Sequence, residues 1–239
     1  MAGDEHLIEV PDAEDPWPLV FEVAAATPEG SWVLVGGLMV HAHAMRAGIT
    51  PSRPTRDVDL LLDIGASKVS DVTGPLQKLG FRPLEGAGAV HRFVRGDDII
   101  DVMVEQGVSA RWTRKPIFAA PAARQAINRR DQYTLEGSSS SVSIGIPDAL
   151  GAIVAKAAAY RVDQRDRGRH LEDIAVLLAS AGGVRMLALD RLTRRDNQHL
   201  RPAFGELSDD GHEAWFVLKA DDQVVGQRGR DAISAAIAA

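Results

Sequence analysis

The spacing of the apolar residues changes near residue 146, and this change limits the folds open to the chain. Before it, apolar residues come in short runs bounded by turn formers, as in 32–35 and 57–63, which is typical of buried strands. After it, they recur at helical spacing through 147–162 and 169–181. We therefore expect an α+β protein, with a mixed sheet and helices in residues 1–146 and a helical domain in residues 147–239.

Turn formers and spacing also predict the smaller elements. Further helices are expected over 19–26, 38–47, 67–79 (with an interruption at Gly74-Pro75), from Pro121 onward, over 184–200 and over 231–238. Further strands are expected over 90–94, 99–104, 132–136 and 142–146, the first two as a hairpin around 95–98. Residues 1–15 are polar and acidic, and we expect no regular structure there.

Composition excludes several classes of protein. The 239 residues contain no cysteine, which excludes a disulfide framework, a zinc–thiolate site and a cysteine nucleophile. The acidic N-terminus lacks the features of a signal peptide, and no apolar stretch approaches the roughly 18 residues of a membrane span, so we expect a cytoplasmic protein with no membrane partner. The net charge of −6 argues against a molecule that binds polyanions over its whole surface.

Asp57 and Asp59 are the first candidate functional residues. They alternate with Val58 and Leu60 in a predicted strand, so both carboxylates project from the same side. Two like charges held close together are unfavourable without a cation between them, and oxygen ligands of this kind suit Mg²⁺. The alternative is that one carboxylate caps a loop and the other lies exposed at a sheet edge.

Two further features favour a phosphate-handling site. Gly36-Gly37 lies between a predicted strand and a predicted helix, where glycines let a phosphate approach the backbone and free amides stabilise anions; a plain strand-to-helix turn is the alternative. Asp101 lies inside the apolar run 99–104, where a carboxylate is costly to bury without a partner. Three acids beside a glycine turn can hold metal ions for phosphoryl or nucleotidyl transfer.

Two segments resemble a known superfamily. Residues 35–63, VGGLMVHAHAMRAGITPSRPTRDVDLLLD, resemble the core signature of the DNA polymerase β-like nucleotidyltransferases. Within them, RPTRDVDL resembles the R-x-T/S-x-D-φ-D-φ form of the AbiEii-like toxin nucleotidyltransferases, which include the MenT toxins. The lysine-bearing segment 146–160 and the following RHLEDIA (169–175) resemble that family's helical region.

The resemblance implies a nucleotidyltransferase-type sheet and a Mg²⁺-dependent enzyme that moves a nucleoside monophosphate from an NTP to an acceptor. It implies metal ligands at Asp57, Asp59 and Asp101, phosphate-loop residues at Gly36 and Gly37, and triphosphate contacts from Arg53 and Lys156. It also implies the tRNA 3′ end as acceptor and a cognate antitoxin as partner. The chain departs from many members in having Gly37 and Leu38 where a serine follows the first glycine, and in having His170 where relatives often have aspartate.

Other interpretations remain open. Without the resemblance, Lys156 is a solvated surface lysine, and His170 forms a local hydrogen bond with Asp173. The acceptor could equally be a protein or a small molecule such as an antibiotic, and the chain could be a non-catalytic binding module of the same fold. One observation favours RNA: residues 111–130 contain no Asp or Glu but carry six basic residues, namely Arg111, Arg114, Lys115, Arg124, Arg129 and Arg130. The alternative is that these residues form an ordinary solvated face in a chain with arginine-rich codon usage.

Overall fold

The computed structural model describes residues 4–50, 53–84, 89–112 and 114–239. The chain forms two compact units, of which the first contains Met1–Met39 and Thr55–Pro147, and the second contains Val40–Pro54 and Asp148–Ala239. The segment 40–54 therefore clusters with the C-terminal helices, although it lies within the first of the two domains expected from the sequence.

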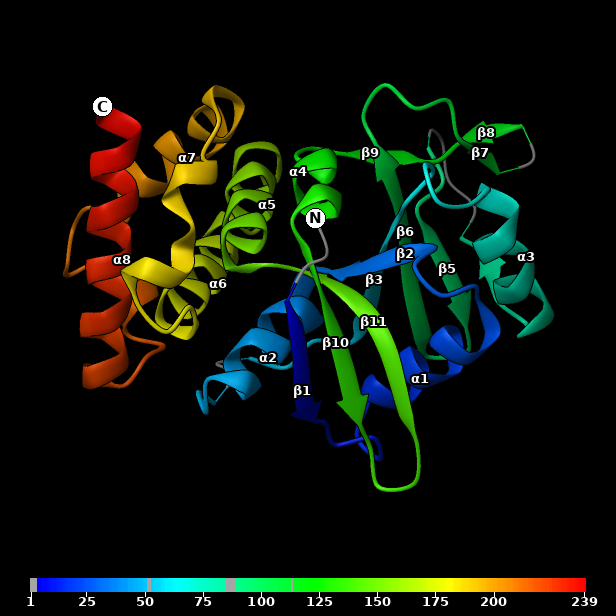
Figure 1. Ribbon diagram of the computed structural model, residues 1–239. Helices are drawn as coiled ribbons and strands as arrows, with labels where there is room; N and C mark the ends of the chain where they lie inside the picture. Colours follow the sequence, from blue (N-terminus) through cyan, green and yellow to red (C-terminus); the bar gives the residue numbers. More distant parts are fainter. Residues whose placement is uncertain (1–3, 51–52, 85–88, 113) are drawn as a thin grey trace. The chain divides into compact units, whose positions relative to one another are not determined.

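The first unit is built on a mixed sheet of nine strands (Figure 1). Its main path follows the order β1 (Glu5–Glu9), β10 (Arg130–Glu136), β11 (Ser141–Pro147), β2 (Trp32–Val35), β3 (Asp57–Leu62), β6 (Asp98–Glu105), β5 (Arg92–Arg95) and β4 (Arg82–Pro83). Strand β9 (Phe118–Ala120) pairs with the end of β6, and β7 (Arg111–Trp112) pairs with β8 (Lys115–Pro116) in a separate hairpin.

The central strands bury one face of the sheet in the core. Strand β3 runs parallel to β6 and antiparallel to β2. Val58 and Leu60 of β3 and Ile100 of β6 are fully buried on one face, so the alternate positions of both strands project to the other face. The helices of this unit are α1 (Trp17–Ala26), α3 (Val69–Lys78), α4 (Ala123–Asn128) and the first turn of α2 (Gly36–Arg46).

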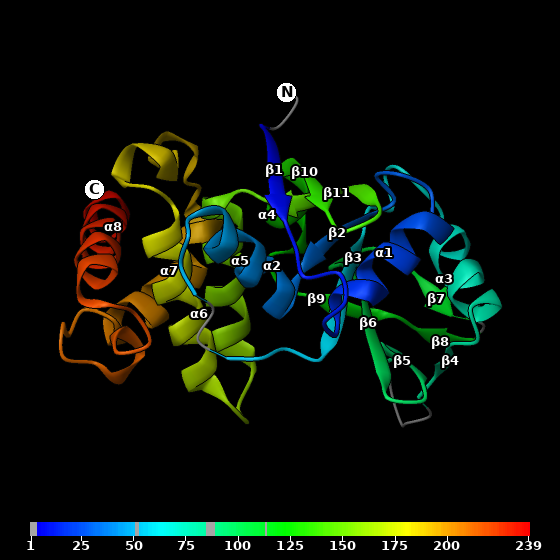
Figure 2. The same cartoon turned by 90° about the horizontal axis from the view of Figure 1, so that it is seen from below.

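The second unit is helical (Figure 2). Its long helices are α5 (Ala149–Val162), α6 (Arg167–Ser180), α7 (Arg194–Glu206) and α8 (Ala220–Ala238), with 3₁₀ turns at Val184–Leu187, Leu189–Arg191 and Glu213–Trp215. Helix α6 packs between α5 and α8. Gly226 of α8 lies against α6, because a Cβ there would come within 3.0 Å of Trp215 and 3.4 Å of the Ala175 carbonyl oxygen.

The structure confirms the expected fold class, a mixed sheet with helices followed by C-terminal helices, but it corrects four details. Residues 5–9 form strand β1 rather than irregular chain, because they pair in parallel with β10. Helix α3 continues through Pro75, since a proline removes only one backbone donor. Residues 184–191 form two 3₁₀ turns before α7, and α8 begins eleven residues before the expected helix at 231.

Across the described parts of the chain, none of the helices has both the length and the apolar character needed to cross a membrane.

Candidate functional site

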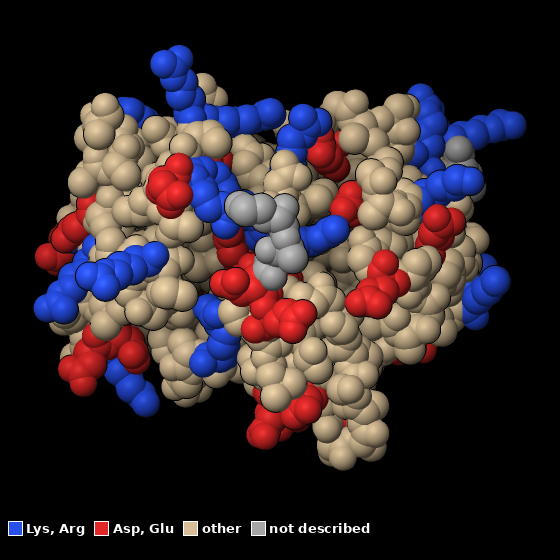
Figure 3. Space-filling model, viewed as in Figure 1, with Lys and Arg blue, Asp and Glu red and all other residues tan. Residues whose placement is uncertain are grey.

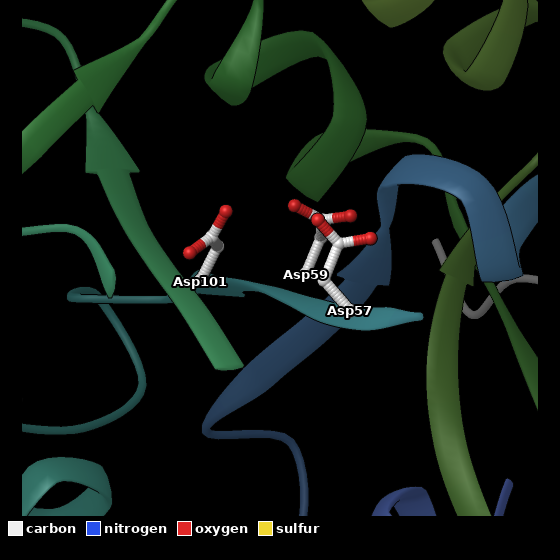
Figure 4. Close-up of side chains that lie close together, drawn as sticks. All are labelled: Asp57, Asp59 and Asp101. Carbon is white, nitrogen blue, oxygen red and sulfur yellow. The ribbon is translucent and has the colours of Figure 1, made fainter. Parts of the chain in front are cut away.

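Asp57, Asp59 and Asp101 come together on the face of the sheet opposite the buried one. Asp57 and Asp59 lie on β3, and Asp101 lies directly across from Asp59 on β6. Figure 4 shows the three side chains pointing to the same side of these strands. Each offers a carboxylate oxygen within 4.8 Å of the others. Parallel register therefore places the third acid beside the first two.

Gly36 and Gly37 leave room for this arrangement. Gly36 has φ +71°, and a Cβ there would overlap the carboxylate of Asp59. A Cβ on Gly37 would come within 2.6 Å of the Thr55 hydroxyl, which donates a hydrogen bond of 3.2 Å to Asp57. Both glycines therefore let the start of α2 approach the acids and their supporting threonine, and the amides of a helix N-terminus favour an anion nearby.

Arg92 lies beside these acids, and it is not among the candidate residues that the sequence indicates. It lies opposite Asp101 in the β5–β6 hairpin. Its Nε and Nη2 donate to the two oxygens of Asp101 at 2.8 and 2.7 Å, and Nη2 lies 3.5 Å from Asp57. The hydrogen bonds to Asp101, with the negative charges of all three aspartates, raise the pKa of Arg92, so it remains charged.

Arg92 could have been found from the hairpin register. A turn at 95–98 pairs 94 with 99, 93 with 100 and therefore 92 with 101, as the structure has it. An arginine directly across from a buried acid predicts an ion pair.

The three carboxylates fit a Mg²⁺ ion in their chemistry and spacing. All three donors are hard oxygen ligands, the kind that Mg²⁺ prefers. Oxygens about 2.1 Å from one ion are at most about 4.2 Å apart, so a shift of under about 1 Å would bring the carboxylates together.

A buried group of charges lies in the helical unit. Lys156 Nζ on α5 and Arg53 Nη2 lie 2.7 and 2.9 Å from the same oxygen of Asp173 on α6. Lys156 is only 6 % exposed, which contradicts the surface-lysine interpretation. Burial acts to raise the pKa of Asp173, but the charges of Lys156 and Arg53 outweigh it and hold that pKa below its usual value. The cluster therefore carries two cations and one anion.

Two histidines belong to the same unit. His41 donates from Nε2 to the Arg53 carbonyl oxygen at 2.9 Å, which requires the tautomer that is protonated at Nε2. His170 bonds to Asp163 at 3.1 Å, so the expected hydrogen bond to Asp173 is wrong. Burial and neighbouring cations lower the pKa of both rings.

The basic residues of 111–130 do not form one continuous free surface. Arg124 pairs with Glu105, Arg130 pairs with Asp63 at 2.6 Å, and Arg129 is buried. On the β7–β8 hairpin three basic residues are exposed, namely Arg111, Arg114 and Lys115. Figure 3 shows basic and acidic side chains interspersed over the visible face.

Comparisons with known proteins place this geometry in context. No family model matches the sequence, and no curated protein matches it. The chain is similar to the crystal structure of an antigenic nucleotidyltransferase-like protein from Paracoccidioides brasiliensis, with a TM-score of 0.43 and 17 % identity over 79 % of this chain and 84 % of that one. It is also similar to the solution structure of the antibiotic-resistance factor ANT(2'')-Ia, with a TM-score of 0.38 and 14 % identity over 92 % of this chain and 94 % of that one. At this level of similarity neither structure decides a function.

Proposed function

We propose that the chain is a Mg²⁺-dependent nucleotidyltransferase. The observation that carries the proposal is the group of three carboxylate oxygens, from Asp57, Asp59 and Asp101, within 4.8 Å of one another on adjacent strands. Such a group suits reactions in which charge develops on a transferring phosphoryl group. In the proposed reaction an acceptor hydroxyl oxygen bonds to the α-phosphorus of an NTP, pyrophosphate leaves, and the hydroxyl proton is lost.

Each part of the site has a role in this proposal. Asp57, Asp59 and Asp101 would hold Mg²⁺, which when bound neutralises phosphate charge and orients the triphosphate. Thr55 orients Asp57 through its hydrogen bond, and Gly36 and Gly37 keep the start of α2 open to a phosphate.

Arg53 and Lys156 are proposed as triphosphate-binding residues on the basis of the sequence resemblance. Their shared partner Asp173 cancels only one of the two positive charges. The Arg53 side chain is 30 % exposed despite this pairing, which leaves it accessible to an anion.

We infer from the resemblance to the toxin family that the acceptor is RNA, most specifically the tRNA 3′ end, and that a cognate antitoxin is a partner. The exposed basic residues of the β7–β8 hairpin support an RNA acceptor, because cations on a surface bind backbone phosphates. The test is incubation of the protein with Mg²⁺, each α-³²P-labelled NTP and total tRNA, both alone and in cell extract, which supplies protein and small-molecule acceptors. Label at the tRNA 3′ end, reduced steeply by added salt and by Arg111→Glu with Arg114→Glu, is the expected result.

Two outcomes would redirect this proposal. Label that enters a protein or a small molecule, with tRNA untouched for all four NTPs, would replace RNA by that acceptor. The second candidate function is a non-catalytic binding module, and the pairing of Arg92 with both oxygens of Asp101 favours it, since that acid already has a cation. Absence of label from every acceptor would favour this candidate.

A further inference from the structure

We propose that Arg92 is a positioning residue that competes with a metal ion for Asp101. While the guanidinium is hydrogen-bonded to this carboxylate, Asp101 is not available as a metal ligand. The inference rests on the proposed function, since it assigns a role at the same three acids. The three acids differ in this proposal. Asp57 and Asp59 are the first metal ligands, and Asp101 becomes a metal ligand only after Arg92 has moved.

The first support is the geometry of the pair. The planar guanidinium faces the carboxylate and engages both oxygens at 2.8 and 2.7 Å, which is the bidentate arrangement. An Asp101 oxygen that binds a cation would have to give up a strong, charge-assisted hydrogen bond. The pair therefore sets a larger free-energy cost on metal binding by Asp101 than on metal binding by Asp57, which the guanidinium reaches only at 3.5 Å.

The second support is position. Arg92, Asp101 and Asp59 occupy one row across β5, β6 and β3, because 92 is opposite 101 and 101 is opposite 59. The guanidinium also reaches Asp57 at 3.5 Å. Arg92 thus places one positive charge among the three negative ones, where a divalent cation is repelled by it.

The third support is that Arg92 can leave. Its side chain is 34 % exposed, whereas Asp101 is 12 % exposed. An arginine that is one-third exposed can exchange the carboxylate for water at modest cost, while the buried acid stays where its strand places it. Movement of the arginine side chain therefore makes Asp101 available as a metal ligand without a change in the sheet.

The test measures Mn²⁺ binding by calorimetry, without nucleotide, in eight proteins: the wild type, R92Q, R92K, R95Q, D59N, D101N, R92Q/D59N and R92Q/D101N. Arg95 is the matched control, because it lies on the same strand but pairs with Glu22 and Asp98 instead. We expect R92Q to bind Mn²⁺ roughly tenfold more tightly than the wild type, because Asp101 no longer has to give up charge-assisted hydrogen bonds, each of which is worth about that factor. R95Q should stay within about twofold of the wild type, because its charge lies outside the cluster.

The double variant separates release of Asp101 from simple loss of a positive charge. If Asp101 supplies the gain, most of it disappears when R92Q is combined with D101N. R92K keeps the charge but cannot hold both oxygens, so it should bind Mn²⁺ with an affinity between those of the wild type and R92Q. R92K also carries the test if R92Q does not fold.

The outcomes that overturn the inference are distinct from those that overturn the proposed function. Mn²⁺ binding that D59N abolishes, but that R92Q and R92K change no more than R95Q does, rejects the role of Arg92 alone. A gain in R92Q that persists fully with D101N also rejects it. Absence of D59N-sensitive Mn²⁺ binding in both the wild type and R92Q rejects the metal site, and with it both proposals.

Discussion

Gly36 determines how closely helix α2 approaches the carboxylates. It combines a left-handed φ of +71° with a Cβ position that Asp59 already occupies. An alanine at 36 would therefore be strained by its backbone and would also displace a proposed metal ligand. Gly30 separates the two effects, because its φ is +73° and no atom of the described residues lies within 4 Å of its Cβ position.

We predict that Gly36→Ala and Gly30→Ala each cost about 1–2 kcal/mol of the free energy of unfolding from backbone strain. Only Gly36→Ala should also weaken Mn²⁺ binding, because only there does the new methyl group push against Asp59. Urea denaturation and calorimetry measure the two quantities. Equal Mn²⁺ affinity in both variants would show that Gly36 serves the turn and not the site.

At this scale the sequence predicts that the three carboxylates are candidates for one site, but it does not predict their counter-ion. Asp57 and Asp59 are predictable because alternate residues of a strand lie on the same face, so the local sequence alone places both charges together. Arg92 was missed because its partner Asp101 lies on the neighbouring strand. Their pairing depends on the register of the two strands, which the residue pattern within one strand does not give. The same limit applies to Asp173, whose partners Lys156 and Arg53 lie far from it in the chain.

At the scale of elements, helices α5 and α6 hold a buried ion cluster that depends most on its anion. Asp173 is the shared partner of both cations, so its loss leaves Lys156 buried with no neutralising charge from this group. Loss of Lys156 leaves Asp173 still held by both Asp173–Arg53 hydrogen bonds, at 2.9 and 3.0 Å.

We predict that Asp173→Asn costs about 3–5 kcal/mol of the free energy of unfolding, because it leaves a buried charge without a partner of opposite sign. Lys156→Met should cost less, roughly 1–3 kcal/mol, because it removes one partner and leaves a satisfied pair. Chemical denaturation ranks the two variants. NTP binding by Lys156→Met should fall in addition, and a cost for Lys156→Met equal to or above that for Asp173→Asn would contradict this account of the cluster.

Element boundaries followed from the sequence where local chemistry decides them. Strand β2 matches its predicted bounds because turn formers enclose its apolar run. The start of α7 was missed, although Thr193 and Asp196 form a capping box whose residues can be recognised in the sequence. Most of α8 was missed because glycine disfavours helices in isolation, while Gly226 is required for contact with α6.

At the scale of the whole molecule, the assignment of segment 40–54 to the helical unit could not be predicted from periodicity. That assignment depends on contacts between residues distant in the chain, such as Arg53 with Asp173. A boundary drawn from local spacing can only fall between consecutive residues, so it assigns everything before 146 to one domain.

The histidines make the stability of the protein sensitive to pH. Burial, reinforced by neighbouring cations, lowers the pKa of His41, His170 and His199 below the ordinary 6.5. The unfolded chain then takes up protons as the pH falls through 6.5, while the folded chain does not until lower pH. Because acid therefore favours the unfolded state, stability rises with pH in this window.

We predict that the thermal midpoint falls between pH 7.5 and pH 5.5, and that His170→Gln makes the decline shallower by removing one of these groups. The glutamine amide can still donate to Asp163, so the hydrogen bond at that position is retained. Scanning calorimetry across this range measures the effect. A midpoint that stays constant or rises toward pH 5.5 would contradict the inferred neutral, buried rings.

The central claim, nucleotidyl transfer at the three aspartates, is tested most directly by following the two ends of the triphosphate separately. The protein is incubated with Mg²⁺, RNA and cell extract, and with NTP labelled either at the α- or at the γ-phosphorus. The account predicts that α-label enters an acceptor and that γ-label leaves only as pyrophosphate. Asp59→Asn should lower this transfer at least about a hundredfold, since metal stabilisation of the charge is worth several kcal/mol, while Asp98→Asn on strand β6 should leave it near the wild-type level. Transfer of γ-label to the acceptor, or full α-label transfer by Asp59→Asn, would contradict the account.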